Sequence, residues 1–223
     1  MAGSTDIAAR LDRSIAGDRV LDHPFYRAWA DGTLTGEELR FYSTQYWRQV
    51  ESFPGYLETL AGRLPESAAR RSVRENLADE RDGDHPGLWL RFASAVGADA
   101  AEVADTPAEA ETLACIQAFE AAVRKRSAMY ALGMIYGYES QTPEVCETKI
   151  TGLRDRYGVS GAGLEYFELH GELDVEHAGE LAAAIEELAA DEDDLRAAEE
   201  GAVAGARAIR GLLDGVARVR EIG

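Results

Sequence analysis

The chain has 223 residues, of which 46% are hydrophobic, and its net charge is −18. This length is enough for one sizeable domain with a packed core. A strongly acidic surface repels nucleic acid and anionic membranes, so neither is an expected partner. No stretch approaches the roughly 18 apolar residues that span a bilayer, and residues 1–6 lack the apolar core of a signal peptide. We therefore expect a soluble, cytoplasmic protein.

Nearly every segment in the first part of the chain has helical periodicity, and no alternating strand pattern flanked by turns is present. Pro24 suits the first turn of a short helix. The run Thr35-Gly36-Glu37-Glu38 forms a capping box, which predicts the start of a long aromatic helix. We expect Pro54-Gly55 to kink or break that helix, because proline removes a backbone donor and clashes with the preceding turn.

The remaining sequence also predicts helices throughout. They are expected from Pro65 to about Glu80, from His85 to near Gly97, from Thr106-Pro107 across Cys115, over 127–139, from Pro143 to Tyr157, around His170, and through the alanine-rich remainder. The stretch 127–139 is apolar on nearly all sides, as a central buried helix would be. Cys115 and Cys146 stand far apart and indicate buried thiols. The sequence thus predicts an all-α fold, a single helical bundle of about seven main helices over residues 1–223.

The most informative pattern is His170, Asp174 and His177, which read as H-x-x-x-D-x-x-H inside a helical stretch. Offsets of four and three residues place all three side chains on one helix face. Each side chain can bind a metal, and their shared face can point into a bundle core. The alternative is an exposed polar stripe on a surface helix.

Three more candidate ligands lie elsewhere in the chain. Glu139 ends the most apolar helix, where a charge is costly unless it is paired or bound to a metal. Glu80 and His85 flank a break at Asp82-Gly83-Asp84. Three carboxylates and three histidines without a thiolate favour two iron or manganese ions that react with O2 over a single zinc. Taken singly, each has an ordinary alternative: Glu80 as a solvated charge, His85 as a helix N-terminal residue, and Glu139 as the partner of a buried arginine.

With these residues in place, the chain resembles the haem-oxygenase-like di-iron oxidases, whose fold is shared by TenA and PqqC proteins. Within them it is most similar to the chlamydial protein associating with death domains and its para-aminobenzoate synthase relatives. The resemblance runs from about His23 to Gly179 and rests on His23-Pro24-Phe25-Tyr26, on 76–80 with 85–89, on Tyr138-Glu139-Ser140-Gln141 with Pro143-Glu144 and Lys149, and on the H-x-x-x-D-x-x-H triplet. It implies a haem-oxygenase-like bundle that forms a homodimer.

The resemblance also implies a ligand set and its cofactors. The ligands are Glu80, His85, Glu139, His170, Asp174 and His177, which would hold two iron ions, or one iron and one manganese. O2 would be the co-substrate, with electrons from an external reductant. The family separates its first Glu and His by seven positions, whereas here the separation is five. Five residues of unbroken helix would point Glu80 and His85 about 140° apart. The helix must therefore break at Gly83 if both bind, and otherwise Asp82 or Asp84 replaces one of them.

In the para-aminobenzoate branch the substrate is a tyrosine of the protein itself, and a lysine donates the amine. The resemblance assigns these roles to Tyr26, with Tyr42 nearby, and to Lys149, one of only two lysines in the chain. It implies an oxidoreductase of para-aminobenzoate and folate biosynthesis. Core packing of the tyrosines and a surface cation at Lys149 are the structural alternatives. The functional alternatives are an oxygenase for a diffusible amino acid, amine or fatty acid, and a non-catalytic helical interaction module.

Overall fold

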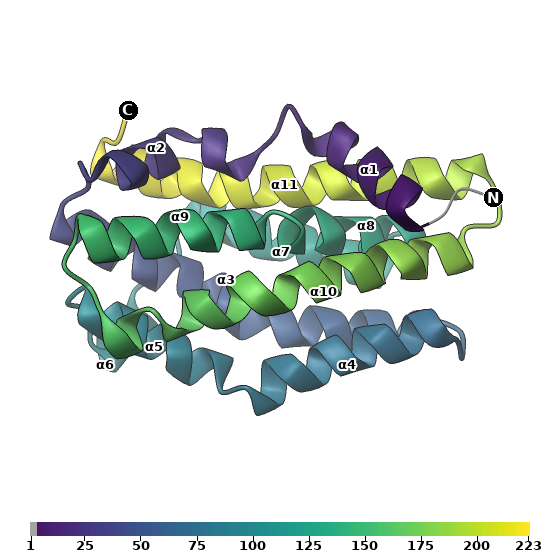
Figure 1. The fold of residues 1–223 in the computed structure, drawn as a ribbon, viewed down its shortest axis with the longest axis horizontal. Helices are drawn as coiled ribbons and strands as arrows, with labels where there is room; N and C mark the ends of the chain where they lie inside the picture. Colours follow the sequence, from purple (N-terminus) through teal and green to yellow (C-terminus); the bar gives the residue numbers. More distant parts are fainter. Residues whose placement is uncertain (1–3) are drawn as a thin grey trace.

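The computed structural model describes residues 4–223, which form eleven α-helices and two short 3-10 helices without a strand. The long helices α3 (Gly36–Arg63), α10 (Glu165–Leu188) and α11 (Glu192–Arg220) run along an elongated bundle (Figure 1). The other elements are α1 (Ser4–Ile15), η1 (Val20–Asp22), α2 (Pro24–Asp31), α4 (Ala68–Asp82), α5 (His85–Ala95), α6 (Ala100–Asp105), α7 (Ala110–Lys125), α8 (Ala128–Glu139), α9 (Thr142–Asp155) and η2 (Gly161–Gly163).

The all-α prediction is confirmed, but the expected number of about seven helices is too low. One reason is α6, whose six residues are too short for periodicity to reveal. It exists because the Asp99 carboxylate accepts a hydrogen bond from the backbone N–H of Glu102 at 2.9 Å, which caps its first turn. A second reason is that short helices such as α2 add to the main helices of the bundle.

Helix α3 confirms one sequence prediction and corrects another. The capping box is present: the Thr35 hydroxyl accepts from the Glu38 N–H, and the Glu38 carboxylate accepts from the Thr35 N–H. The expected break at Pro54 does not occur, and the helix continues to Arg63. Residues on both sides of the proline, including Phe53 and Tyr56, are buried in the core. Their packing outweighs the roughly 3 kcal/mol that an internal proline costs.

Helices α8 and α11 approach one another backbone to backbone. A Cβ atom at Gly133 or Gly137 of α8 would overlap backbone atoms of α11. A Cβ atom at Gly201 or Gly205 of α11 would overlap backbone atoms of α8. The two G-x-x-x-G pairs therefore interlock, and α8 is buried on nearly all sides, as predicted. This packing holds Glu139, the last residue of α8, inside the bundle.

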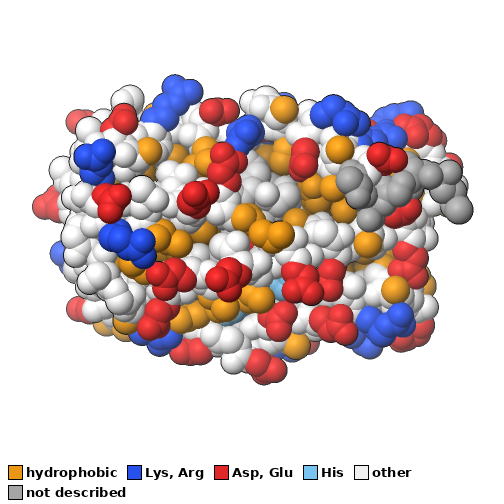
Figure 2. Space-filling model, viewed as in Figure 1, with side chains coloured by type: hydrophobic (Ala, Val, Ile, Leu, Met, Phe, Trp, Pro, Cys, Tyr) orange, Lys and Arg blue, Asp and Glu red, His pale blue; other side chains and the backbone are white. Residues whose placement is uncertain are grey.

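The surface fits the acidic composition. Asp and Glu side chains are spread across the face of the molecule that Figure 2 shows, and lysine and arginine are fewer. Many of the arginines that are present pair with carboxylates, such as Arg10 with Glu199 at 2.8 Å and Arg218 with Glu111 at 2.6 Å. Among the described residues, no helix is both long enough and apolar enough to cross a membrane.

Candidate metal centre

The six predicted ligand residues are all buried and lie in two groups of three. In each group, one potential ligand atom per residue lies within 4.8 Å of the other two. The groups are Glu80, His85 and His170, and Glu139, Asp174 and His177. Helix α10 contributes to both groups, because the offsets within its triplet keep all three side chains on the inward face. The triplet is at most 4% exposed, so the surface-stripe alternative is wrong.

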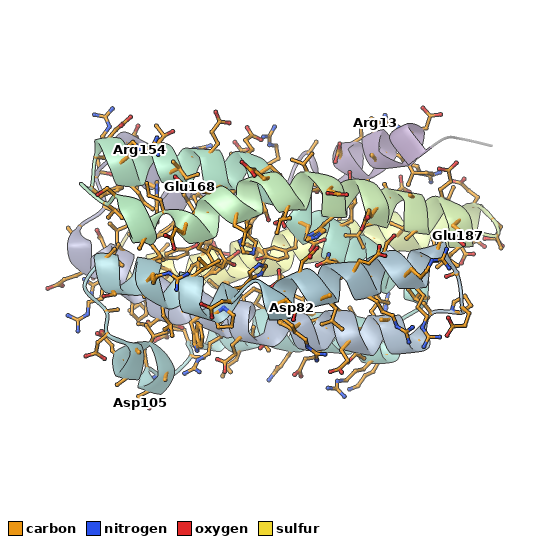
Figure 3. The ribbon with its side chains drawn as sticks, turned by 60° about the horizontal axis from the view of Figure 1, so that its bottom comes forward. Arg13, Asp82, Asp105, Arg154, Glu168 and Glu187 are labelled. Atoms are coloured by element: carbon orange, nitrogen blue, oxygen red, sulfur yellow. The ribbon has the colours of Figure 1, made fainter. Side chains whose placement is uncertain are left out.

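A break between α4 and α5 brings Glu80 and His85 together in spite of their short separation. Gly83 ends α4, and Asp84 adopts the left-handed conformation with φ 52° before His85 begins α5. The predicted break is therefore confirmed, and His85 Nδ1 lies 2.8 Å from Glu80 Oε2. Asp82 and Asp84 are exposed at this junction, where Figure 3 labels Asp82, and belong to neither group.

The first group is electrostatically matched. Burial alone would raise the pKa of Glu80, but hydrogen bonding from His170 and His85 outweighs it and holds the pKa at about 2. Burial lowers the pKa of His170, yet Glu80 and Asp174 together raise it above the ordinary value. His170 Nδ1 lies 2.7 Å from the Tyr166 carbonyl, to which it donates, so Nε2 faces Glu80 Oε1 at 3.6 Å.

The second group places two carboxylates beside one histidine. Burial, followed by the charge of Asp174, raises the pKa of Glu139 well above its ordinary value. Burial lowers the pKa of His177, but Asp174, Glu139 and Asp79 outweigh it and raise that pKa to about 9. His177 Nδ1 lies 3.5 Å from Asp174 Oδ1 and 3.9 Å from Glu139 Oε1. The raised pKa of Glu139 means that a second carboxylate charge in this buried place is costly without a cation.

Several buried polar atoms in both groups have no hydrogen-bond partner among residues 4–223. They are His85 Nε2, Glu139 Oε2 and His177 Nδ1. Orphaned donors and acceptors of this kind are rare in folded proteins, and each costs about 1–3 kcal/mol when left unpaired. Carboxylate oxygens and imidazole nitrogens are suitable ligands for iron and manganese. The residues therefore fit two such ions, one at each group.

Two supporting residues of the site were not assigned from the sequence. Asn76 Nδ2 donates to Glu139 Oε1 at 2.9 Å, and Asp79 Oδ2 lies 3.2 Å from His177 Nε2. Both contacts orient a candidate ligand from behind, as outer-shell groups do in metal sites. The sequence could have indicated both residues, because Asn76 and Asp79 precede the candidate ligand Glu80 by four and one positions on α4. The Tyr166 carbonyl, which accepts the hydrogen bond from His170, could not be found from the sequence, because every residue has a backbone carbonyl.

The predicted catalytic residues Tyr26, Tyr42 and Lys149 lie together in an aromatic chamber beside the metal groups. Lys149 Nζ donates to the Tyr42 hydroxyl at 2.7 Å and lies 5.5 Å from the centre of the Tyr26 ring. It also lies 4.9 Å from the ring centre of Tyr46 and 4.8 Å from that of Phe167. At 3% exposure, Lys149 is not the surface cation of the alternative interpretation. Burial lowers its pKa to about 8 and raises the pKa of Tyr26 and Tyr42.

The chamber continues to the candidate ligands through two further tyrosines. A cavity of about 20 Å³ lies among Tyr26, Tyr138, Tyr166 and Lys149. It has room for about one water molecule. The ring of Tyr166 stacks on His170 at 4.1 Å between centroids, and Tyr138 directly precedes Glu139. The lysine, the tyrosines and the two groups of candidate ligands thus lie next to one another in the buried core.

Comparison with known proteins finds a matching family, similar sequences and a similar fold. The family described as iron-containing redox enzyme matches residues 40–210. A 4-aminobenzoate synthase from Chlamydia pneumoniae is 36% identical over 172 residues, which cover 76% of this chain and 77% of that protein. Another, from Nitrosomonas europaea, is 34% identical over 192 residues and covers 81% and 78%. A TenA homologue from Pseudomonas syringae pv. tomato superposes with a TM-score of 0.82 at 16% identity, covering 97% and 96%, which shows a common fold.

Proposed function

The chain belongs to the family of iron-containing redox enzymes, and from this premise we propose that it is a para-aminobenzoate synthase that consumes its own Tyr26 and Lys149. As a member of this family it is an oxidoreductase, which counts against the non-catalytic interaction module. The observation that carries the proposal is the buried contact between an amine and a phenol ring beside two groups of metal ligands.

The six candidate ligands would hold two iron ions, or one iron and one manganese. When bound, these ions supply the oxidising power of O2, with electrons from an external reductant. The first group would use Glu80, His85 and His170, and the second would use Glu139, Asp174 and His177. Asn76 and Asp79 would orient Glu139 and His177 from outside.

The atoms of the product match the side chains in the chamber. Para-aminobenzoate has seven carbons, and the side chain of tyrosine, from Cβ through the ring, also has seven. Release requires that the Cα–Cβ bond of Tyr26 and the Cε–Nζ bond of Lys149 both break. Cβ becomes the carboxyl carbon, the nitrogen of Lys149 replaces the phenol oxygen, which leaves as water, and Cε is left as an aldehyde. O2 and the reductant account for the change in oxidation state.

The chamber prepares both side chains for this chemistry. Because burial lowers the pKa of Lys149 to about 8, roughly a tenth of the amine is neutral and nucleophilic at pH 7. Tyr42 accepts a hydrogen bond from the amine and fixes its position. Tyr26 is 2% exposed and keeps its phenol proton, because burial raises its pKa. The 20 Å³ cavity leaves no space for a separate organic substrate beside the Tyr26 ring, which supports an internal one.

The test is to measure para-aminobenzoate formed by reduced, iron-loaded protein exposed to O2 without any added organic substrate. We expect no more than about one equivalent per chain, because each turnover destroys its own residues. Tyrosine labelled with ¹³C in the protein should appear in the product ring. Tyr26→Phe should stop product formation while the protein keeps its metal.

Lys149→Arg is the matched variant for the amine, because arginine keeps the positive charge but offers no primary amine. It should also stop product formation without loss of metal. If the label stays out of the product, or if product accumulates over many turnovers only with an added substrate, the self-consuming proposal is wrong. An oxygenase for a diffusible amino acid, amine or fatty acid then takes its place.

A further inference from the structure

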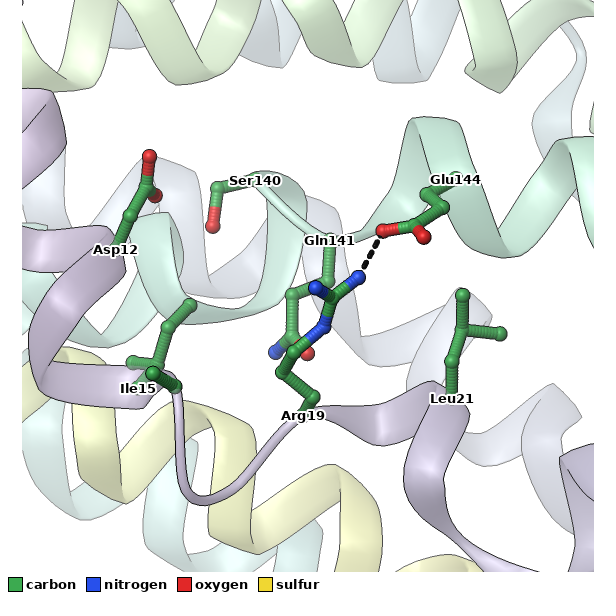
Figure 4. A pocket seen from close by; sticks show the side chains of 8 residues that line it. Asp12, Ile15, Arg19, Leu21, Ser140, Gln141 and Glu144 are labelled. Carbon is green, nitrogen blue, oxygen red and sulfur yellow. Dashed lines mark hydrogen bonds and ion pairs between the residues drawn. The ribbon is translucent and has the colours of Figure 1, made fainter.

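A pocket on the surface lies directly outside the aromatic chamber. It opens between the α1–η1 segment and the junction of α8 with α9, and its volume is about 270 Å³ (Figure 4). Its lining residues are Asp12, Ile15, Ala16, Arg19, Leu21, Ser140, Gln141 and Glu144. Arg19 and Glu144 form an ion pair across it, which the dashed line in Figure 4 marks. The buried Ser140 hydroxyl has no hydrogen-bond partner among residues 4–223.

One side chain is shared by this pocket and the chamber. Gln141 lines both the surface pocket and the inner cavity beside Tyr26 and Lys149. Its amide is held at both ends: Oε1 accepts from the Val20 N–H at 2.8 Å, and Nε2 donates to the Gly137 carbonyl at 2.8 Å. Rotation of this amide would break both hydrogen bonds.

The opposite side of the pocket is fixed more firmly. Arg207 pairs with Asp18 at 3.0 Å, and Arg210 donates to the Arg19 carbonyl, so α11 anchors the segment between α1 and η1. Opening by movement of this segment would break these contacts together with the bond to Val20. Rotation of the Gln141 side chain alone would break fewer contacts than movement of this segment. It is therefore the easier way to connect the pocket with the chamber.

We propose that this pocket is the portal of the aromatic chamber, that Gln141 is its gate, and that it takes a one-ring aromatic carboxylate. Ile15 and Leu21 offer apolar surface to a ring, and the Arg19 guanidinium can exchange Glu144 for a carboxylate ligand with the same fork geometry. The proposal rests on the proposed function, because the product of that reaction is such an acid and must leave a chamber of buried side chains.

The two cysteines provide matched reporters for the gate. Cys146 lines the inner cavity, whereas Cys115 lies on α7 beside Gln49, away from that cavity. They are 1% and 2% exposed, and burial raises the pKa of both thiols to about 12. Both thiols are buried, so the change in the alkylation rate of each cysteine on substitution reports a change in its access.

The experiment compares iodoacetamide alkylation of Cys146 and Cys115 by mass spectrometry in Gln141→Ala and in Gln117→Ala, a matched control at an exposed position of α7. In Gln141→Ala we expect Cys146 to react about 10- to 100-fold faster, the effect of losing two hydrogen bonds of ordinary strength, while Cys115 keeps its rate. An unchanged Cys146 rate would overturn the gate. Equal acceleration of both cysteines would overturn it as well, because it would report general loosening.

A second arm tests the ligand class without any turnover. Para-aminobenzoate should slow alkylation of Cys146 in Gln141→Ala, aniline should not, and the additional substitution Arg19→Met should remove the protection. Equal protection by aniline, or protection that survives Arg19→Met, would refute a carboxylate site at Arg19. These measurements need neither iron nor O2. Failure of the portal therefore leaves the proposed synthase reaction standing, and failure of the reaction leaves the portal standing.

Discussion

Replacing Gly83 with alanine should damage the first metal group through a single methyl group. A Cβ atom at Gly83 would stand 2.6 Å from His85 Nε2 and 2.8 Å from the Asp79 carbonyl oxygen. The backbone angles at Gly83, φ −79° and ψ 5°, are open to any residue, so alanine adds no backbone strain. The whole effect must come from the overlap, which costs roughly 1–3 kcal/mol in a packed site.

The overlap is relieved most easily when the His85 ring swings away, because a side chain moves more readily than the α4 backbone. This movement takes the imidazole away from Glu80, whose Oε2 lies 2.8 Å from Nδ1. We expect metal affinity at the group of Glu80, His85 and His170 to fall about 10- to 100-fold, the range for displaced supporting or ligand groups. The second group shares no residue with this junction and should keep its metal.

The assay combines urea unfolding followed by circular dichroism with iron content after competition with a chelator. Gly62→Ala is the control, because Gly62 is exposed on α3 and a Cβ there meets nothing within 4 Å. That variant should gain about 0.5–1 kcal/mol from the better helix propensity of alanine. If Gly83→Ala binds metal as the wild type does and matches Gly62→Ala in stability, the reasoning about the break is wrong.

Three further predictions follow from the packing and the charges. Lys149→Met should flatten the pH dependence of stability: the folded pKa of about 8 lies below the ordinary 10.5, so the unfolded chain binds more protons in this window. The free energy of unfolding of the wild type should therefore rise by up to roughly 3 kcal/mol between pH 8 and pH 10.5. If urea unfolding gives the two proteins the same change in free energy over this pH range, the prediction is wrong. Gly137→Ala should lower the free energy of unfolding by about 3 kcal/mol, because its Cβ atom meets the α11 backbone. Gly179→Ala is the control, because a Cβ atom there meets nothing within 4 Å. Equal melting temperatures of the two variants would refute the close packing of α8 on α11. A His170→Ala, Asp174→Ala double variant should lose metal and keep its helical circular dichroism, and full metal occupancy would rule out the site.

The sequence was sufficient for the residues that share a helix face and insufficient for those that meet across helices. The triplet on α10 follows from offsets of four and three alone. The break before His85 could be anticipated because Gly83 stands between two aspartates. The outcome at Pro54 could not, since it depends on how much core the flanking residues bury. The contact of Asp79 with His177 joins residues 98 positions apart, and local periodicity carries no information about it.

Because of the interlocked glycines of α8 and α11, the two groups of candidate ligands differ in how easily their side chains can move. Glu139 stands at the end of a helix whose backbone rests on another backbone, with no intervening side chain that could change its rotamer. Its partners Asp174 and His177 belong to one uninterrupted helix. In the other group, His85 follows a junction at Asp84 that dihedral rotation can adjust. If the distances between the ligands change, His85 would therefore move more than Glu139, which the packing of α8 against α11 holds in place.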